Sequence, residues 1–152
     1  IFMFFSPTTC WRRVAVRKTR TRQDWAHEIR TLVDVDFPHA ERIVLVMDNL
    51  NTHGIASLYA TFPPDEARRL AEKLEIHHTP KHGSWLNMAE LELSVLTRQA
   101  LGGRIPDHGM LSRRAQDWMI LRNQKEMTVD WRFSKEDARI KLKKLYPSFH
   151  VS

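Results

Sequence analysis

An acidic residue ends the most apolar stretch of the chain, IVLVMDNLNTH, residues 43–53. The apolar run at residues 43–47 contains two valines and an isoleucine, which predicts a strand buried on both faces, as in the parallel part of an α/β sheet. Open parallel sheets bind ligands at the carboxyl ends of their strands, so Asp48 is well placed for chemistry. Asp48 and Asn49 are also common turn residues, and a simple turn is the alternative.

A second candidate acid, Glu90, lies in GSWLNMAELEL, residues 83–93. Asn87 and Glu90 form a capping-box pattern at the start of a predicted helix, which gives Glu90 a structural alternative. Glu92 flanks the apolar stripe of this helix on the opposite side, at a similar angle. Periodicity therefore does not choose between Glu90 and Glu92.

The elements that must position these acids follow a mixed α/β pattern of hairpin, helix, strand, helix, strand and helices. IFMFF and WRRVAVRK, joined by a turn at SPTT, predict an antiparallel hairpin. A helix is predicted over residues 22–36, capped by Thr21 and Asp24 and ended by Pro38. The residues expected on its inward face are Trp25, Ile29, Leu32 and Val33.

The remaining predicted elements follow the strand over residues 43–48. An irregular segment leads to a helix over residues 65–74 and a short strand over residues 75–79. The helix that carries Glu90 is predicted to stop at Gly102 and Gly103, with Leu86, Ala89, Leu93, Leu96 and Ala100 on one face. Two further helices are expected, one over residues 107–123 and one that begins near Ser134 and ends before Pro147.

The length of 152 residues suits one domain, and 42% hydrophobic with 28% charged residues describes an ordinary soluble protein. The apolar runs are too short to span a bilayer, and IFMFF lacks the features of a secretory signal. The single cysteine, Cys10, excludes an internal disulfide framework and fits a reducing compartment. Because the chain begins with Ile1 and not with Met, we expect a fragment whose start lies upstream.

Lys and Arg outnumber Asp and Glu by 24 to 18, and the excess lies in two clusters. The first comprises Arg12, Arg13, Arg17, Lys18, Arg20 and Arg22, and the second comprises Arg132, Lys135, Arg139, Lys141, Lys143 and Lys144. Such clusters suit a polyanion such as DNA, although solvated basic faces are common on ordinary proteins.

Four motifs together carry a resemblance to a known family: VMDNLNTH, HHTPKHGSWLNMAELELSVLTRQ, IPD and WRFSKEDARIKLKKLYP. With them the chain resembles, over nearly its whole length, the catalytic core of DDE transposases from bacterial insertion sequences related to mariner elements. The resemblance implies that Asp48 is the second catalytic acid, within a motif completed by Asn49 and His53. It also implies that Glu90 is the third, in a motif that includes Trp85, Leu86 and Asn87. The mariner branch usually has Pro-Ile before this Glu, whereas the Met88-Ala89 of this chain matches the insertion-sequence branch.

The fold implied by the resemblance is RNase H-like, a mixed sheet flanked by helices, and residues 1–152 are expected to form a single, partial catalytic domain that lacks the first strand. The family's first catalytic Asp lies on that strand, and its DNA-reading segment lies further upstream. Asp24, Asp34 and Asp36 fall in or after the first helix, so none replaces the first Asp. Its loss is expected to leave two sheet edges without their shared partner.

The chemistry implied is metal-dependent cleavage and joining of DNA strands. Two divalent cations, Mg²⁺ or Mn²⁺, lie about 4 Å apart in such sites and are held by three carboxylates. With only Asp48 and Glu90 available, we expect this chain alone to bind metal poorly and to be inactive. Zinc is disfavoured, because His77, His78 and His82 have no cysteine nearby and fit no common zinc spacing.

The partners implied are DNA and a second transposase copy in a synaptic complex, in a bacterial cytoplasm near the nucleoid and without a membrane. The residues expected to contact DNA are Arg12, Arg13, Arg17, Lys18, Lys81, His82 and Trp85. Two other functions remain open. One is an inactive remnant that binds DNA non-specifically or associates with intact transposase, and the other is a plain structural domain, which the basic clusters disfavour.

Overall fold

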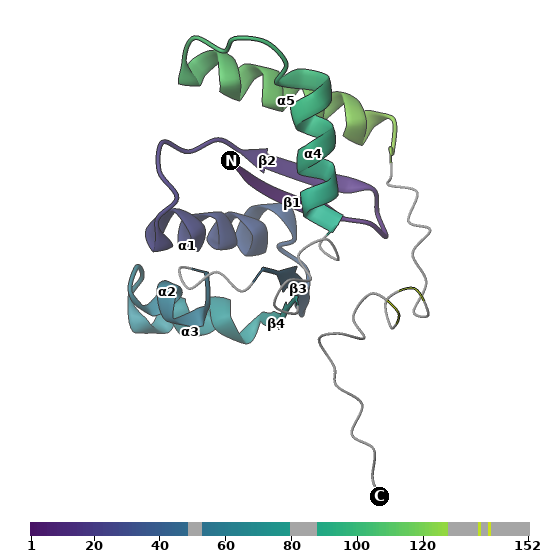
Figure 1. Ribbon diagram of the computed structural model, residues 1–152. Coiled ribbons are helices and arrows are strands. Elements are labelled where there is room, and N and C mark those ends of the chain that lie inside the picture. The colour runs from purple at the N-terminus through teal and green to yellow at the C-terminus, as the bar shows by residue number, and fades with distance from the viewer. Residues whose placement is uncertain (49–52, 80–87, 128–136, 138–139, 141–152) are drawn as a thin grey trace, which may run out of the picture.

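A computed structural model describes residues 1–48, 53–79, 88–127, 137 and 140 of the chain. Strands β1 (Phe2–Ser6) and β2 (Trp11–Ala15) form the predicted antiparallel hairpin, with Phe2 opposite Ala15 and Ser6 opposite Trp11. The turn places Cys10 at a φ of 54°, in the left-handed region that few side chains adopt. The hairpin lies between helices on its two sides (Figure 1).

Helix α1 (Arg22–Thr31) continues into a π-helical turn, η1 (Leu32–Asp36), and together they confirm the helix predicted over residues 22–36. The predicted cap is present, because the Thr21 hydroxyl accepts a hydrogen bond from the Asp24 N–H while the Asp24 carboxylate accepts one from the Thr21 N–H. All four residues predicted to face inward are buried, namely Trp25, Ile29, Leu32 and Val33. They join the larger core, which α1 shares with β1, β3, α2 and α3.

Strands β3 (Ile43–Met47) and β4 (Leu74–His78) pair in parallel, with Met47 opposite His78. The connection between them contains α2 (Ile55–Tyr59), which the sequence prediction treated as irregular, and α3 (Pro64–Glu72), which was predicted. The prediction that β3 is buried on both faces is wrong, because Val44 and Val46 are 61% and 52% exposed. In the described part of the chain, only one face of this parallel pair packs on the core.

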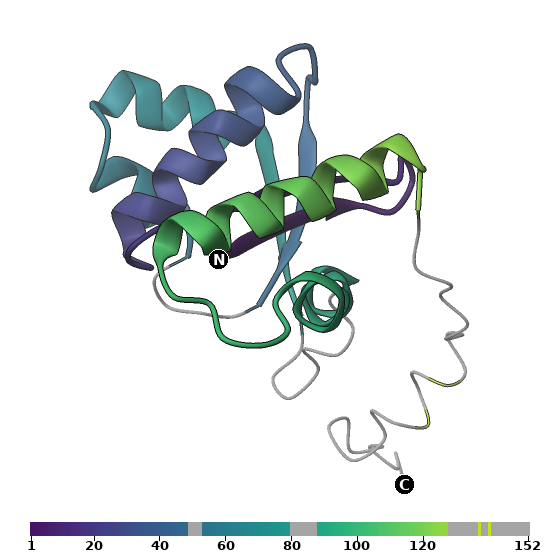
Figure 2. The same ribbon diagram turned by 90° about the horizontal axis from the view of Figure 1, so that it is seen from above.

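Helices α4 (Met88–Ala100) and α5 (His108–Gln124) cover the hairpin on the side away from α1 (Figures 1 and 2). They form a second core with the hairpin, centred on Val14, Leu96, Ala115 and Trp118. Asp107 caps α5 by accepting a hydrogen bond from the Met110 N–H at 2.8 Å. The helix predicted near Ser134 lies outside the described residues, apart from positions 137 and 140.

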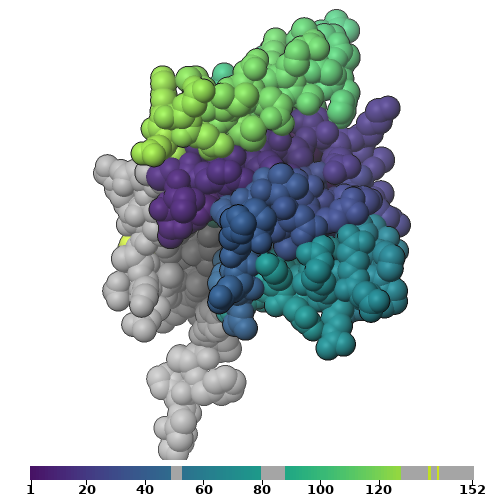
Figure 3. Space-filling model, turned by 180° about the vertical axis from the view of Figure 1, so that it is seen from behind, coloured from purple at the N-terminus to yellow at the C-terminus, as the bar shows by residue number. Residues whose placement is uncertain are grey.

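The layers follow one another as α5, the hairpin, α1, and then α2 with α3, an order that Figure 3 shows from behind. Among the described residues the four strands form two separate two-stranded sheets, β1–β2 and β3–β4. The fold is therefore mixed α/β, as predicted, with no strand in the described residues that joins the two sheets.

Candidate functional site

Asp48 directly follows β3, at the carboxyl end of the parallel pair. The ladder continues one residue past β4, because the Thr79 N–H donates to the carbonyl oxygen of Met47, the last residue of β3, at 2.9 Å. This bond holds the backbone next to Asp48 firmly against β4. The Asp48 side chain is 47% exposed, so its carboxylate is open to a ligand from solvent. Residues 49–52, including Asn49, lie outside the described part of the chain.

The imidazole of His53 lies beside Asp48, with Nδ1 3.7 Å from Oδ1 of the carboxylate. The ring stacks on Trp25 of α1, with 5.9 Å between centroids and 13° between planes, and it meets Phe2 of β1 at 6.0 Å. Burial lowers the pKa of His53 from its ordinary value, and Asp48 acts in the opposite direction. A neutral, stacked histidine therefore stands behind the exposed acid.

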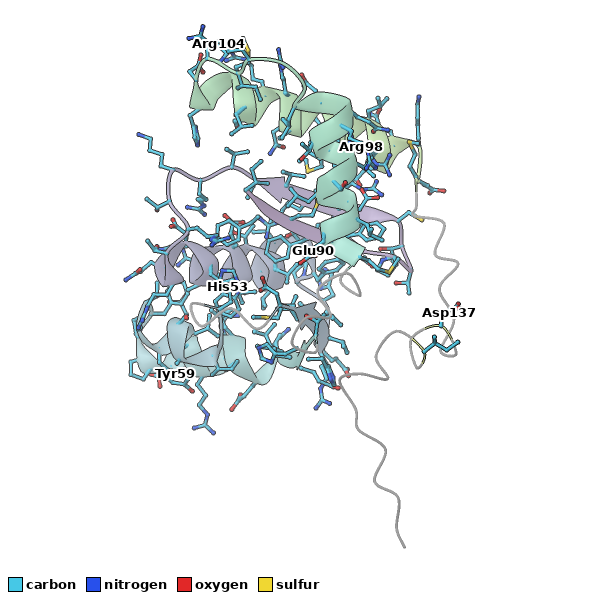
Figure 4. The ribbon with its side chains drawn as sticks, in the orientation of Figure 1. His53, Tyr59, Glu90, Arg98, Arg104 and Asp137 are labelled. Carbon is cyan, nitrogen blue, oxygen red and sulfur yellow. The ribbon has the colours of Figure 1, made fainter. Side chains whose placement is uncertain are left out.

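Glu90 lies in the first turn of α4 and is exposed. The two ribbon views agree that this end of α4 lies beside the carboxyl ends of β3 and β4 (Figures 1 and 2). Figure 4 labels Glu90 there, and labels His53 between α1 and the layer formed by α2 and α3. The capping-box alternative for Glu90 requires Asn87, which is outside the described residues.

Glu92 has the opposite environment from Glu90, although only two residues separate them. Its side chain is fully buried and accepts hydrogen bonds at 2.9 Å from Arg12 Nε and from an Arg122 Nη. Arg12 is also fully buried, and Arg122 is 6% exposed at its side chain. We call these three residues the Arg–Glu–Arg cluster. The cluster joins β2, α4 and α5, so the role of Glu92 is to hold α4 on the hairpin.

Two of the residues predicted to contact DNA are unsuitable for that role in this structure. Arg12 belongs to the Arg–Glu–Arg cluster, and burial lowers its pKa while Glu92 raises it. Arg13 pairs with Glu28 and, at 2.5 Å, with Asp36, and its side chain is only 14% exposed. Both guanidinium groups are paired with carboxylates inside the protein. The structure therefore does not support the prediction that Arg12 and Arg13 bind phosphate.

The other predicted DNA contacts divide into two groups. Arg17 pairs with Glu28 at 2.7 Å but stays exposed at its outer edge, and Lys18 is exposed. The residues outside the described part of the chain are Lys81, His82, Trp85 and the whole second basic cluster.

Among the described residues, no group of three or more His, Cys, Asp or Glu side chains is arranged to hold a metal. His77 instead contacts Glu75 at 2.8 Å.

Sequence reasoning missed both the cluster around Glu92 and the packing of His53. A charged residue that flanks an apolar stripe usually faces solvent, so Glu92 gave no local sign of burial. The aromatic partners of His53 come from distant segments, α1 and β1, and only the tertiary fold brings them together.

An exposed acid at the carboxyl end of a parallel strand, with a second acid on the neighbouring helix, is typical of the ligand-binding edge of an α/β enzyme. Comparison with known families identifies the enzyme class as endonuclease. The chain belongs to the DDE superfamily endonucleases, whose family model matches residues 1–112. No curated protein and no solved structure matches the chain. DNA is the substrate that a nuclease of this family implies. No helix among the described residues is long and apolar enough to cross a membrane.

Proposed function

We propose that this chain is the catalytic part of a transposase from a mariner-related bacterial insertion sequence. It cuts DNA at the ends of the element and joins the free 3′-hydroxyl to a target by in-line phosphoryl transfer. The observation that carries the proposal is the exposed carboxylate of Asp48 at the end of β3, beside the first turn of α4, in a chain of the endonuclease family.

The family fold we propose is RNase H-like. Two separate two-stranded sheets, one antiparallel and one parallel, are what a mixed sheet would leave if a central strand between them were missing. In that arrangement β1 and β3 are the edges that face the missing strand. That this chain forms a partial domain, with a further strand supplied by residues encoded before Ile1, is part of the proposal.

Asp48 and Glu90 are the residues we propose to hold a divalent metal. The Asp48 side chain is 47% exposed and Glu90 is exposed, and carboxylate oxygens of this kind suit Mg²⁺ or Mn²⁺. Glu92 does not fit, because its charge is already neutralised by two buried guanidinium groups. Asp48 and Glu90 would hold the metal, which would supply Lewis-acid activation of the attacking hydroxyl and stabilisation of the leaving oxygen.

The loop after β2 is the part of the described chain that we propose to contact DNA. Lys18 is exposed, and Arg17 retains an exposed edge on the same loop after β2, so this loop is the basic surface we propose for phosphate contact. A dimer on paired DNA ends, in the bacterial cytoplasm with the nucleoid, completes the proposal by analogy with the family.

One observation favours a second function, an inactive remnant that binds DNA or associates with intact transposase. Among the described residues, no group of three or more His, Cys, Asp or Glu side chains is placed to hold a metal, so no third acid is seen for the proposed site. Two carboxylates would supply fewer oxygen ligands than a pair of divalent cations needs, so they would hold the pair poorly. Reading the codons before Ile1 separates the two functions: a strand ending in Asp supports the enzyme, and a stop codon or unrelated sequence supports the remnant.

The test is cleavage of element-end DNA in Mg²⁺ by the whole gene product, so that any residues encoded before Ile1 are present. Asp48→Asn and Glu90→Gln are expected to abolish strand cleavage while the protein remains folded. Glu72→Gln is the matched control, because Glu72 is an exposed acid on α3 that forms a surface ion pair with neighbouring Arg68. Cleavage that survives in Glu90→Gln would show that Glu90 is the capping residue and not the third acid.

A further inference from the structure

His53 is the residue whose chemistry the fold alone does not explain. Its side chain is 13% exposed and is held between the rings of Trp25 and Phe2, which come from α1 and β1. Trp25 and Phe2 are themselves buried in the larger core. The imidazole is therefore fixed by groups that belong to the rigid part of the molecule.

One nitrogen of this ring has no structural use. Nε2 is buried and finds no hydrogen-bond partner among the described residues. An unpaired buried nitrogen is unfavourable, and a phenylalanine ring would fill the same space without that cost. Packing alone would thus favour Phe at this position. The presence of histidine points to the other nitrogen, Nδ1.

Nδ1 faces the carboxylate of Asp48 at 3.7 Å. This distance is longer than a hydrogen bond, but it is within ion-pair range, so the two groups are neighbours. A carboxylate at a strand end can otherwise adopt several rotamers, and a metal ligand must present its oxygens in one direction. An imidazole held by Trp25 and Phe2 can favour one orientation of the neighbouring Asp48 carboxylate.

We propose that His53 is a positioning residue, which holds the Asp48 carboxylate in the direction needed to bind a divalent cation. The inference rests on the proposed function, because it gives His53 a role only if Asp48 is a metal ligand. It adds an outer partner to the site: α1 and β1, through Trp25 and Phe2, hold His53, and His53 holds Asp48. In other proteins, removing a partner of this kind typically weakens metal binding by about 10- to 100-fold.

The experiment compares His53→Phe and His53→Asn by Mn²⁺ binding, measured from the free-ion paramagnetic resonance signal, and by thermal unfolding of the metal-free whole gene product. Phe keeps the stacked ring without nitrogens, whereas Asn loses the ring but can place an amide N–H near the position of Nδ1. We expect His53→Phe to unfold at or above the wild-type temperature and to bind Mn²⁺ about 10-fold more weakly. His53→Asn should be less stable than His53→Phe and yet bind Mn²⁺ more tightly.

A purely structural His53 gives the reverse ranking, with metal affinity following stability in both variants, and that result overturns the inference. Failure of His53→Phe to fold also overturns it, because the fold would then require the ring nitrogens. Asp48→Asn separates the inference from the proposed function. If Asp48→Asn loses Mn²⁺ and His53→Phe does not, the proposed function stands and the positioning role falls. If wild type and Asp48→Asn both fail to bind Mn²⁺, both proposals fall.

Discussion

Replacing Glu92 by glutamine should be the most damaging single change of an acid in the described part of the chain. The substitution keeps the size of the side chain but removes the negative charge between Arg12 and Arg122, which approach it at 2.9 Å each. Two buried positive charges are then left together without compensation. Breaking a buried ion pair in this way costs about 3–5 kcal/mol, a large share of the 5–15 kcal/mol that usually stabilises a domain.

The assay is urea unfolding followed by tryptophan fluorescence, because Trp118 of α5 lies 5.1 Å from the Arg122 guanidinium and reports on this region. Glu72→Gln, which breaks an exposed pair on α3, is the control and should leave the urea midpoint unchanged. A triple variant, Arg12→Met with Glu92→Leu and Arg122→Met, removes all three charges and should recover most of the lost stability. Equal midpoints for Glu92→Gln and Glu72→Gln would refute the argument that Glu92 neutralises buried charge.

Two further predictions concern acid stability and DNA. The pKa of Asp24 is lowered from 3.8 to about 2, first by the Thr19 hydroxyl and then by the N–H and hydroxyl of Thr21. Because the pKa of Asp24 is lower in the folded protein than in the unfolded chain, its contribution to folding stability is complete above pH 3.8 and is lost as the pH falls toward 2. Asp24→Asn should therefore make stability depend less on pH in this range of the acid unfolding curve. An unchanged slope would contradict the cap. DNA binding should be weak, independent of sequence and steeply salt-dependent. In a fluorescence titration, Lys18→Gln should reduce the affinity equally for two unrelated duplexes, because Lys18 is an exposed charge that would contact phosphate. A loss of affinity confined to one duplex would instead show that the protein reads sequence.

The elements that local sequence signals specify were predicted correctly. The cap at Thr21 and Asp24 and the spacing of the apolar residues after it define α1, and the turn residues between two β-rich runs define the hairpin. Each of these signals acts between residues close in sequence. The short helix α2 was missed because a five-residue helix is too short to show a period.

The candidate site was predictable only in part, because its character depends on long-range packing. The position of Asp48 follows from the strand before it. Periodicity left Glu90 and Glu92 equivalent, and the structure separates their environments through Arg12 and Arg122, which lie 80 residues before and 30 residues after Glu92. The same pairing explains why Arg12, counted from sequence as part of a basic surface, is buried. Whether Glu90 binds metal stays a prediction.

The exposed face of β3 is where sequence pattern and structure disagree most, and substitution can decide between them. Val44 and Val46 are 61% and 52% exposed, although an apolar run of five residues predicts burial on both faces. Threonine keeps the β-branched shape and strand preference of valine while adding a hydroxyl. On an exposed face the double variant Val44→Thr with Val46→Thr should change the free energy of unfolding by less than about 1 kcal/mol, as surface changes do. A covered face would instead bury two unpaired hydroxyls, at about 1–3 kcal/mol each. Leu58→Ala in the fully buried part of the core, expected to cost about 2–5 kcal/mol, calibrates the same urea titration. A double variant that loses as much stability as Leu58→Ala would mean that this face is covered in solution and that the strand is buried on both sides, as its sequence predicts.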